Sequence, residues 1–395
     1  MAHGSLPWSR LFDSAIAYAN EANVTELDVS ILNSVTYPVI DASPGLREVY
    51  IKENGEFVNV GDVIHRPKLA ATLRRIADNP ESFYTGSLAE DIVREITTDG
   101  GGIITLGDLA NYTSIWRDPV HFQFKNLSFA VTPPPFGGTV FALAMNILDN
   151  FDLIQDDVDS THFIVESWKW AFDDRFALGD PAFLPNITEI VNTMTSKSHA
   201  DLLAAKISAN TTFPADYYCD LVNTTEIDQV IEDHGTMNLN VLDKFGNAVA
   251  VTSTVNLYFG SLFVGPTTGI VYNNQMDDFA VPQLINSFDV PPAPNNYIQP
   301  GKRPLSSMNP MIATNQDNQV VYVGGGSGGT RIITAPMLVA LNILLFNNAP
   351  DYAIGKSRMH HQLLPNKITI ELEFPQHLHD GLTEKNHIVT TFFHI

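Results

Sequence analysis

The 395-residue sequence has little cysteine, little positive charge and no long apolar run. Its single cysteine, Cys219, excludes an internal disulfide. Lysine and arginine number 22 against 44 aspartates and glutamates, a formal net charge of −22. This excess argues against binding to nucleic acid, because the phosphates would be repelled. The first residues, MAHGSLPWSRLF, contain no apolar stretch long enough for a signal peptide or a membrane anchor.

The rest of the composition is that of a globular protein with glycosylation signals in its first part. Hydrophobic residues make up 44% and charged residues 17%, and a chain of this length can bury a core. Six Asn-x-Ser/Thr signals precede residue 236 and none follows it; they lie at Asn23, Asn111, Asn126, Asn186, Asn210 and Asn223. They predict a glycosylated surface, and a secretory protein whose leader is missing would explain both this pattern and the N-terminus.

Helical spacing of apolar residues dominates the first part of the chain, and strand-like alternation begins near residue 232. Helices are expected at 68–80, 87–101, 139–151, 161–181 and 335–348, the fourth ended by Gly179 and Pro181. A hairpin is expected over 238–256 and a further strand at 319–325. Mixed strands and helices indicate an α/β or α+β layered fold.

The hairpin permits a prediction of which side chains meet. If 244–246 is a three-residue loop with Gly246 in the left-handed conformation, antiparallel pairing places Thr236 opposite Thr254. Asn256, two residues further on, shares a face with Thr254. Periodicity alone favours a simple interpretation, a solvent-facing polar row on an edge strand.

A cut between Gly235 and Thr236 would turn this threonine into a nucleophile that carries its own base. A threonine hydroxyl is weakly nucleophilic and needs a base, and a new α-amino group, with a pKa of about 8, could accept its proton. Gly235 suits such a cut, because glycine tolerates the unusual backbone that a self-attacking peptide needs. A Gly-Thr pair alone does not indicate a cleavage site; the evidence comes from the segments that follow it.

Two later segments offer groups for binding an anion. The glycine run 324–329 lies between a strand and a helix, where backbone N–H groups can hold an anion or an oxyanion. It lacks G-x-x-x-x-G-K-[ST], so a nucleotide site is not indicated. Ser306 and Ser307 lie in a proline-bounded turn, for which turn formation is the usual explanation.

Acidic and histidine pairs complete the candidates. Asp277 and Asp278 are adjacent acids of the kind that usually mark a solvated loop, and their window has too few ligands for a metal site. His360 and His361 have no partner at metal-ligand spacing, which favours a structural role and predicts no metal site.

At these segments the chain resembles the gamma-glutamyltransferase (glutathione hydrolase) family. The matching stretches are DHGT at 233–236, GNAVAVTSTVNLYFGS at 246–261, GIVYNNQMDDF at 269–279, GKRPLSSMNP at 301–310, GGGSGGTRIIT at 324–334 and RMHHQLLPN at 358–366. The resemblance implies an α+β fold of the N-terminal-nucleophile hydrolase type, a four-layer αββα sandwich formed jointly by two subunits. Residues 1–235 would be the C-terminal part of the large subunit and 236–395 the small subunit, held as a heterodimer after self-cleavage.

The same resemblance implies a role for each matching residue. Thr236 is the nucleophile, Thr254 supports it, and Gly328 and Gly329 provide the oxyanion-hole amides. The residues implied for the donor amino group are Asn256, Gln275 and Asp278, and those for its carboxylate are Ser306 and Ser307. Complementary charge and hydrogen bonding fit these placements.

The reaction implied is acyl transfer without a cofactor or a metal. Thr236 would attack the γ-amide of glutathione or a conjugate, and water or an acceptor amino acid or peptide would resolve the γ-glutamyl-enzyme. The resemblance also implies a location on the extracellular face of the plasma membrane or outside the cell.

The chain departs from the family pattern at three places. What looks like the first third of the large subunit is absent, and with it the arginine that pairs with the donor carboxylate; Arg10, Arg47 and Arg66 do not lie in that motif. Asn238 stands where the family usually has histidine, and the chain ends short of the final strands. A non-catalytic family remnant is therefore the alternative, and a related acylase is a third interpretation.

Overall fold

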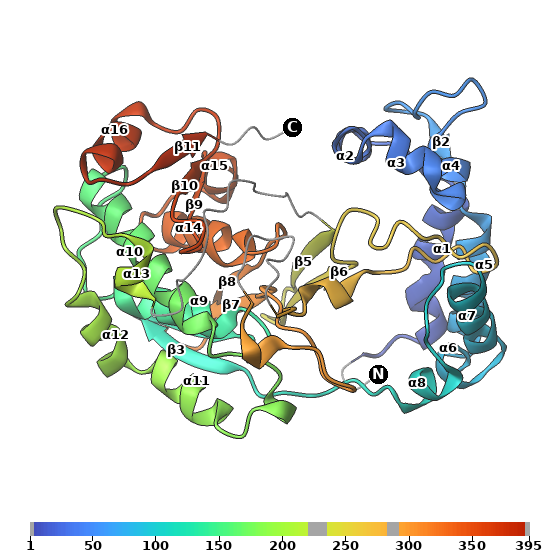
Figure 1. Ribbon diagram of the computed structural model, residues 1–395, viewed down its shortest axis with the longest axis horizontal. Helices are drawn as coiled ribbons and strands as arrows, with labels where there is room; N and C mark the ends of the chain where they lie inside the picture. Colours follow the sequence, from blue (N-terminus) through green and yellow to red (C-terminus); the bar gives the residue numbers. More distant parts are fainter. Residues whose placement is uncertain (1–3, 220–234, 283–291, 392–395) are drawn as a thin grey trace. The chain divides into compact units, whose positions relative to one another are not determined.

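The computed structural model describes residues 4–219, 235–282 and 292–391. Contacts between Cα atoms divide these residues into two compact units (Figure 1). The first joins 4–116 to 257–274, and the second joins 117–256 to 275–391. Each unit therefore contains residues from both sides of the Gly235–Thr236 bond, so the predicted division at this bond does not coincide with the boundary between the units.

The first unit is mainly helical. Its helices are η1 (Trp8–Phe12), α1 (Asp13–Asn20), α2 (Glu26–Val35), α3 (Tyr37–Ala42), α4 (Pro44–Tyr50), α5 (Pro67–Asp78), α6 (Ser82–Thr85), α7 (Ser87–Thr98) and α8 (Leu106–Asn111). Two short antiparallel strands, β1 (Ala22–Asn23) and β2 (Val63–Ile64), pair within it. The helices α5 and α7 confirm two predictions made from apolar spacing, and α7 buries Leu88 and Ile92.

A buried carboxylate anchors the returning segment 257–274 to this unit. Glu95 of α7 is 1% exposed and accepts hydrogen bonds from the backbone N–H groups of Thr267 (3.1 Å) and Thr268 (3.2 Å). The hydroxyls of Thr268 and Tyr272 also donate to it. These bonds satisfy a carboxylate that burial would otherwise penalise, and they join a helix before residue 235 to a segment after it.

The second unit is built on a four-stranded antiparallel sheet in the order β3-β4-β7-β8. Its strands are β3 (Val120–Phe124), β4 (Leu127–Val131), β5 (Thr236–Leu242), β6 (Ala248–Thr254), β7 (Met311–Thr314), β8 (Val320–Gly324), β9 (Met359–His360), β10 (Ile368–Ile370) and β11 (Val389–Thr391). The strands β5 and β6 form a hairpin beside β8, and β11-β10-β9 form a small mixed sheet. This combination of strands and helices confirms the α+β class.

The second unit also contains α-helices and short 3-10 helices. They are α9 (Gly138–Leu148), α10 (Val158–Arg175), η2 (Pro181–Phe183), α11 (Ile187–Thr195), α12 (Lys197–Ala204), α13 (Ala215–Tyr218), η3 (Gln275–Asp278), η4 (Pro294–Asn296), α14 (Arg331–Leu344), α15 (Pro350–Gly355) and α16 (Gln376–Glu384). Every residue of α9 is buried, as expected for a helix that is apolar all round. It packs against α10, α11, α12 and α14 and against β3 and β4 (Figure 1).

The predicted helices 139–151, 161–181 and 335–348 are present, but their predicted ends differ from those of α9, α10 and α14 by up to six residues. Helix α10 stops at Arg175, ahead of Gly179, because the chain tightens there into three-residue turns that begin with the Phe176 N–H bonded to Asp173 O (3.0 Å). Helix α14 starts at Arg331 and continues through Pro336, whose missing N–H falls near its N-terminal end.

No helix among the described residues is both long and apolar enough to cross a membrane.

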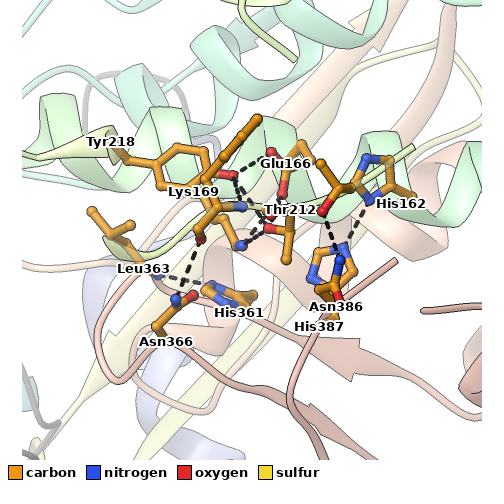
Figure 2. A network of polar contacts seen from close by, with 12 residues as sticks. His162, Glu166, Lys169, Thr212, Tyr218, His361, Leu363, Asn366, Asn386 and His387 are labelled. Carbon is orange, nitrogen blue, oxygen red and sulfur yellow. Dashed lines mark hydrogen bonds and ion pairs between the residues drawn. The ribbon is translucent and has the colours of Figure 1, made fainter. Parts of the chain in front are cut away.

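A buried polar network connects α10 to segments on both sides of the Gly235–Thr236 bond (Figure 2). The carboxylate of Glu166 accepts from Thr212 (2.7 Å) and from the Tyr218 hydroxyl (2.5 Å), and the Lys169 ammonium lies 3.3 Å from it. Because each of these side chains is bonded to another within the network, it can be buried without a large desolvation cost.

Two histidines extend this network to the C-terminal part of the chain. His162 Nε2 faces the Ser208 carbonyl at 2.7 Å and therefore carries the proton, so Nδ1 accepts from His387 Nε2 at 2.8 Å. His162, Glu166 and His387 group their ligand atoms within 4.8 Å of one another. Both ring nitrogens of His162 and both oxygens of Glu166 already have protein partners, and the adjacent ammonium of Lys169 would repel a cation, so this cluster is a hydrogen-bonded support.

Prediction: the stability of the protein falls as the pH drops from 7 to 5. Burial lowers the pKa of His360 to about 3 and that of His387 to about 2, and it holds the pKa of His361 well below its usual value. Unfolding returns each imidazole to a pKa near 6.5, so below about pH 6.5 the unfolded chain binds protons that the folded chain does not. Each histidine then contributes a loss of up to about 1.4 kcal/mol per pH unit.

Denaturant unfolding at pH 5, 6 and 7 measures this slope, because carboxylates stay ionised in both states over most of that range. His361→Asn should reduce the slope, and His121→Gln, at an exposed position, should leave it as in the parent. A free energy of unfolding that does not change between pH 5 and 7 would contradict the prediction.

Candidate active site

The hairpin β5–β6 has the predicted register. Thr236 pairs with Thr254 and Leu242 with Ala248, and Gly246 in the loop has φ +85°. The pairing that the loop length and antiparallel geometry predict is therefore confirmed.

The hydroxyls of Thr236 and Thr254 meet beside the Gly235–Thr236 peptide bond. Their Oγ1 atoms lie 2.8 Å apart. Thr254 Oγ1 also donates to the Gly235 carbonyl oxygen (3.1 Å) and accepts from the Asn256 N–H (2.8 Å). The Val255 N–H donates to the same Gly235 carbonyl at 3.1 Å. Two donors on one carbonyl oxygen polarise it toward nucleophilic attack.

The single proton of the Thr254 hydroxyl fixes the direction of these bonds. If that proton is given to the Gly235 carbonyl, Thr254 Oγ1 must accept from Thr236 as well as from the Asn256 N–H. The hydroxyl of Thr236 then points its proton at Thr254 and leaves its own lone pairs free. This is the arrangement that a nucleophile next to a carbonyl needs.

The polar face of the hairpin turns toward a cavity, so the interpretation as a solvent-facing polar row was wrong. Thr236 and Thr254 are half-buried, and Asn256 is 3% exposed with a left-handed φ of +78°. The opposite face carries the more exposed side chains, such as Leu239 at 54% and Val251 at 43%. The usual distribution of polar and apolar side chains is therefore reversed on these two strands.

The cavity gathers residues that lie far apart in the sequence. It is lined by Arg175, Phe176, Thr236, Thr254, Asn256, Asp278, Ala280, Ala293, Asn296, Leu305, Ser306, Ser307, Met308, Gly329, Thr330 and Ile332. Seven of the nine residues predicted for catalysis and donor binding line it: Thr236, Thr254, Asn256, Asp278, Ser306, Ser307 and Gly329. Gln275 and Gly328 are not among the lining residues.

Asp278 is held at the cavity wall by its neighbours. It ends the short helix η3 and is 8% exposed, and the Gln275 amide donates to its carboxylate. Asn296 donates to its backbone carbonyl at 2.6 Å and accepts from the Leu305 N–H at 2.9 Å. The structure thus places Gln275 behind Asp278, where it orients the carboxylate that faces the cavity.

The serine turn is seated against the glycine pair of residues 137 and 138. The Ser306 N–H donates to Pro135 O (2.8 Å), and the Gly137 N–H donates to Met308 O (3.1 Å). A Cβ atom on Gly137 would lie 2.5 Å from the carbonyl oxygen of Ser307, so this position accepts only glycine without displacing the turn. The breaker cluster PPPFGG therefore shapes the site, a role that its sequence did not reveal.

The glycine loop lies at the N-terminus of α14. Gly328 and Gly329 have positive φ values of +112° and +54°, and the helix begins two residues later. This placement puts Gly329 and the N-terminal end of α14, where the helix dipole is positive, at the cavity. It is compatible with the predicted role of this loop in holding an oxyanion.

Asn238 supports the hairpin from the position where the family usually has histidine. Its Nδ2 donates to Val251 O and to Thr252 Oγ1, both at 3.0 Å. The side chain lies against Gly325 of the glycine loop, where an added Cβ would collide with it. Asn238 thus joins β5, β6 and the loop by hydrogen bonds and contact, although it is smaller than histidine.

Sequence reasoning missed Arg175. This residue ends α10, lines the cavity, and donates from Nη2 to Ser307 Oγ at 3.4 Å. Burial lowers the pKa of its guanidinium to about 10, and the charge of Asp278 opposes that shift. The available signal was a basic residue at the end of a long, mostly buried helix, directly before the turn to LGDP.

Comparisons with known proteins agree with this geometry. The Gamma-glutamyltranspeptidase family model matches residues 1–393. Glutathione hydrolase 3 of Arabidopsis thaliana is 38% identical over 93% of this chain and 57% of its own length. Glutathione hydrolase proenzyme 1 of Schizosaccharomyces pombe is 34% identical over 98% of this chain and 61% of its own. The crystal structure of cephalosporin acylase from Bacillus halodurans superposes with a TM-score of 0.82 at 26% identity, over 99% of this chain and 68% of that one.

The fold is that of the N-terminal-nucleophile hydrolases, as the resemblance implied. Within that class, the chain belongs to the gamma-glutamyltranspeptidase family. It spans about three fifths of the length of these two curated relatives.

Prediction: Gly137→Ala weakens the site without unfolding the protein. The new methyl group must push the Ser307 backbone away, because the two atoms would otherwise lie 2.5 Å apart. Binding of a ligand held by the serine hydroxyls should weaken about tenfold, the cost of one displaced hydrogen bond. Glutamate binding by calorimetry is the measurement, with Gly355→Ala as the matched control, since nothing lies within 4 Å of a Cβ there. Unchanged affinity in Gly137→Ala would contradict the proposed seating of the turn.

Proposed function

We propose that this protein transfers γ-glutamyl groups from glutathione or its conjugates to water or to amino acid and peptide acceptors, after cutting itself between Gly235 and Thr236. The contact of Thr236 Oγ1 with Thr254 Oγ1 beside the Gly235 carbonyl, within a cavity that also holds Asp278, carries the proposal. The names of the two curated relatives, glutathione hydrolases, support it.

Self-cleavage begins with an attack by Thr236 on the carbonyl carbon of Gly235. The hydroxyl oxygen forms a bond to that carbon, the C–N bond breaks, and the nitrogen takes up the hydroxyl proton to become a free α-amine. Water then hydrolyses the resulting ester, leaving a carboxylate on Gly235 and restoring the Thr236 hydroxyl. Hydrogen bonds from Thr254 and Val255 to the carbonyl oxygen stabilise the negative charge that develops there.

The freed α-amine then acts as the base for acyl transfer. It removes the proton of the Thr236 hydroxyl as Oγ1 attacks the γ-carbonyl carbon of the donor, and it returns that proton to the departing amine. A γ-glutamyl ester on Thr236 remains. Water or the amino group of an acceptor attacks this ester, forms the product and releases the threonine. The amides of Gly328 and Gly329 are the proposed donors to the oxyanion in each step.

Charge complementarity selects a donor with a free amino acid end. The carboxylate of Asp278 pairs with the α-ammonium group of the donor, with help from Asn256 and Gln275. Ser306 and Ser307 offer hydroxyl protons to its α-carboxylate. An acyl donor that has no α-amine would lose this charge-assisted hydrogen bond to Asp278. The requirement for that amine separates a γ-glutamyl site from a site for acyl groups that lack it.

We further propose a large and a small subunit that remain together after cleavage, as a glycoprotein outside the cell or at its surface. Two sets of hydrogen bonds support association of the two segments. Those of Glu95 join residues before the cut to residues after it, and those of Glu166 belong to a network that does the same. The five glycosylation signals within the described residues, at Asn23, Asn111, Asn126, Asn186 and Asn210, are all exposed. The sixth, Asn223, lies outside the described residues, as do Asp233 and His234 of the DHGT stretch.

The alternative is a non-catalytic member of the family. This alternative was considered because the arginine that binds the donor carboxylate is absent from its usual motif. Arg175 at the cavity makes that absence a weaker argument. Cleavage and turnover by the purified chain distinguish the two.

Prediction: the purified chain separates into two fragments whose masses place the cut between Gly235 and Thr236. Thr236→Ala abolishes the cut, because the nucleophile is gone. Thr254→Val slows it about 10- to 100-fold, because one donor to the Gly235 carbonyl is lost. Thr314→Val, on β7, is the matched control and should be cut at the parent rate. A chain that is folded by circular dichroism but stays intact would support the non-catalytic alternative.

Prediction: Asp278→Asn selectively impairs donors that carry an α-ammonium group. Loss of the charged hydrogen bond should raise KM for γ-glutamyl-p-nitroanilide about 10- to 100-fold. Hydrolysis of glutaryl-p-nitroanilide, which lacks the α-amine, should stay low and change little. Equal losses for the two substrates would show that Asp278 supports the structure and does not recognise the amine.

A further inference from the structure

Arg175 holds a positive charge inside the cavity wall with spare hydrogen-bonding capacity. Its Nε atom is buried and has no hydrogen-bond partner among the described residues. Its Nη2 atom reaches Ser307 Oγ at 3.4 Å. Arg175 ends α10, and this helix is held in the core by Trp168 and by the Glu166 network. The position of the guanidinium is therefore well fixed.

The bond to Ser307 has a directional consequence. A guanidinium has no acceptor, so Arg175 can only donate, and Ser307 Oγ must accept. The hydroxyl proton of Ser307 is then free to turn into the cavity. Ser307 is 7% exposed and its turn is fixed by the bonds at Pro135 and Gly137, so this proton has few other directions available.

We propose that Arg175 positions and polarises Ser307 as a donor to the α-carboxylate of the γ-glutamyl donor, and thereby makes the site selective for a free, negatively charged carboxylate. This proposal rests on the proposed function and deepens it. The guanidinium supplies a positive charge next to the serine pair. Its Nε–H, which has no partner among the described residues, attracts an anion. The carboxylate group of the ligand supplies that anion.

Pairing with Asp278 alone does not explain why Arg175 places a buried positive charge at this cavity. The attraction between them is present, and Asp278 has the ammonium group of the donor as its own proposed partner. A cavity with one buried cation and one buried anion on its walls is complementary to a zwitterion, which carries both charges. The α-amino acid end of a γ-glutamyl compound is such a group.

The test compares two donors that differ only in this charge, γ-glutamyl-p-nitroanilide and its α-methyl ester. We expect Arg175→Met to lower kcat/KM for the free acid about 10- to 100-fold, mainly through KM, and to change the value for the ester less than about threefold. The ratio of the two values is independent of the fraction of active enzyme, so it remains valid if Arg175→Met folds less well. Arg175→Lys keeps the positive charge but loses the planar guanidinium with its paired donors, so it should restore part of the acid-to-ester ratio.

Two controls complete the design. Arg358→Met removes an arginine of the same unit that pairs with Glu371 at 2.7 Å and does not line the cavity, and its ratio should equal that of the parent. Ser307→Ala combined with Arg175→Met should lose little more than either change alone, because the two residues act as one donor. An equal loss on the acid and the ester in Arg175→Met would overturn the proposal.

Binding separates a failure of this proposal from a failure of the proposed function. Calorimetry with L-glutamate and its α-methyl ester measures the same discrimination without turnover, in Thr236→Ala as well as in the parent. If the parent turns over no γ-glutamyl donor but binds glutamate in preference to the ester, with Arg175→Met losing the preference, the proposed function fails and the role of Arg175 stands. No preference for glutamate over the ester in the parent would overturn the role of Arg175.

Discussion

The pairing of Thr236 with Thr254 across the hairpin is the constraint on which the rest of the site depends. It brings a hydroxyl to the carbonyl that precedes it in the chain, and it places a second hydroxyl where it can donate to that carbonyl. A shift of one residue in the register would turn Thr236 to the opposite face of β5, away from the cavity. The loop around Gly246 and the amide of Asn238 both hold the register against such a shift.

The remaining walls of the cavity come from segments that the fold brings to this pairing. The serine turn rests on the glycine pair after β4, Asp278 is held by Asn296, and the glycine loop continues into α14. Each wall is fixed by backbone hydrogen bonds or by close packing, which leaves little freedom for side chains that must meet one ligand. Arg175 adds a charge from a helix anchored in the core. The walls thus place one positive and one negative side chain at the cavity, as the proposed zwitterionic ligand requires.

Local patterns in the sequence predicted the helices α5, α7 and α9 and the complete register of β5–β6, because apolar spacing and loop length act over a few residues. The resemblance supplied the residues that line the cavity, such as Asp278 and Ser307. Tertiary facts were not predictable in the same way. The contact of Gly137 with Ser307 and the reach of Arg175 join positions more than 100 residues apart, and the end of α10 depends on the turn that follows it.

The most direct test of the central claim is to trap the acyl group on the nucleophile. The purified protein is mixed with a γ-glutamyl donor, quenched in acid within the first turnover, and digested for peptide mass spectrometry. The account predicts a γ-glutamyl group attached to the peptide that begins with Thr236, absent from samples without donor. A γ-glutamyl group on any other residue, with turnover intact, would contradict the assignment of Thr236 as the nucleophile.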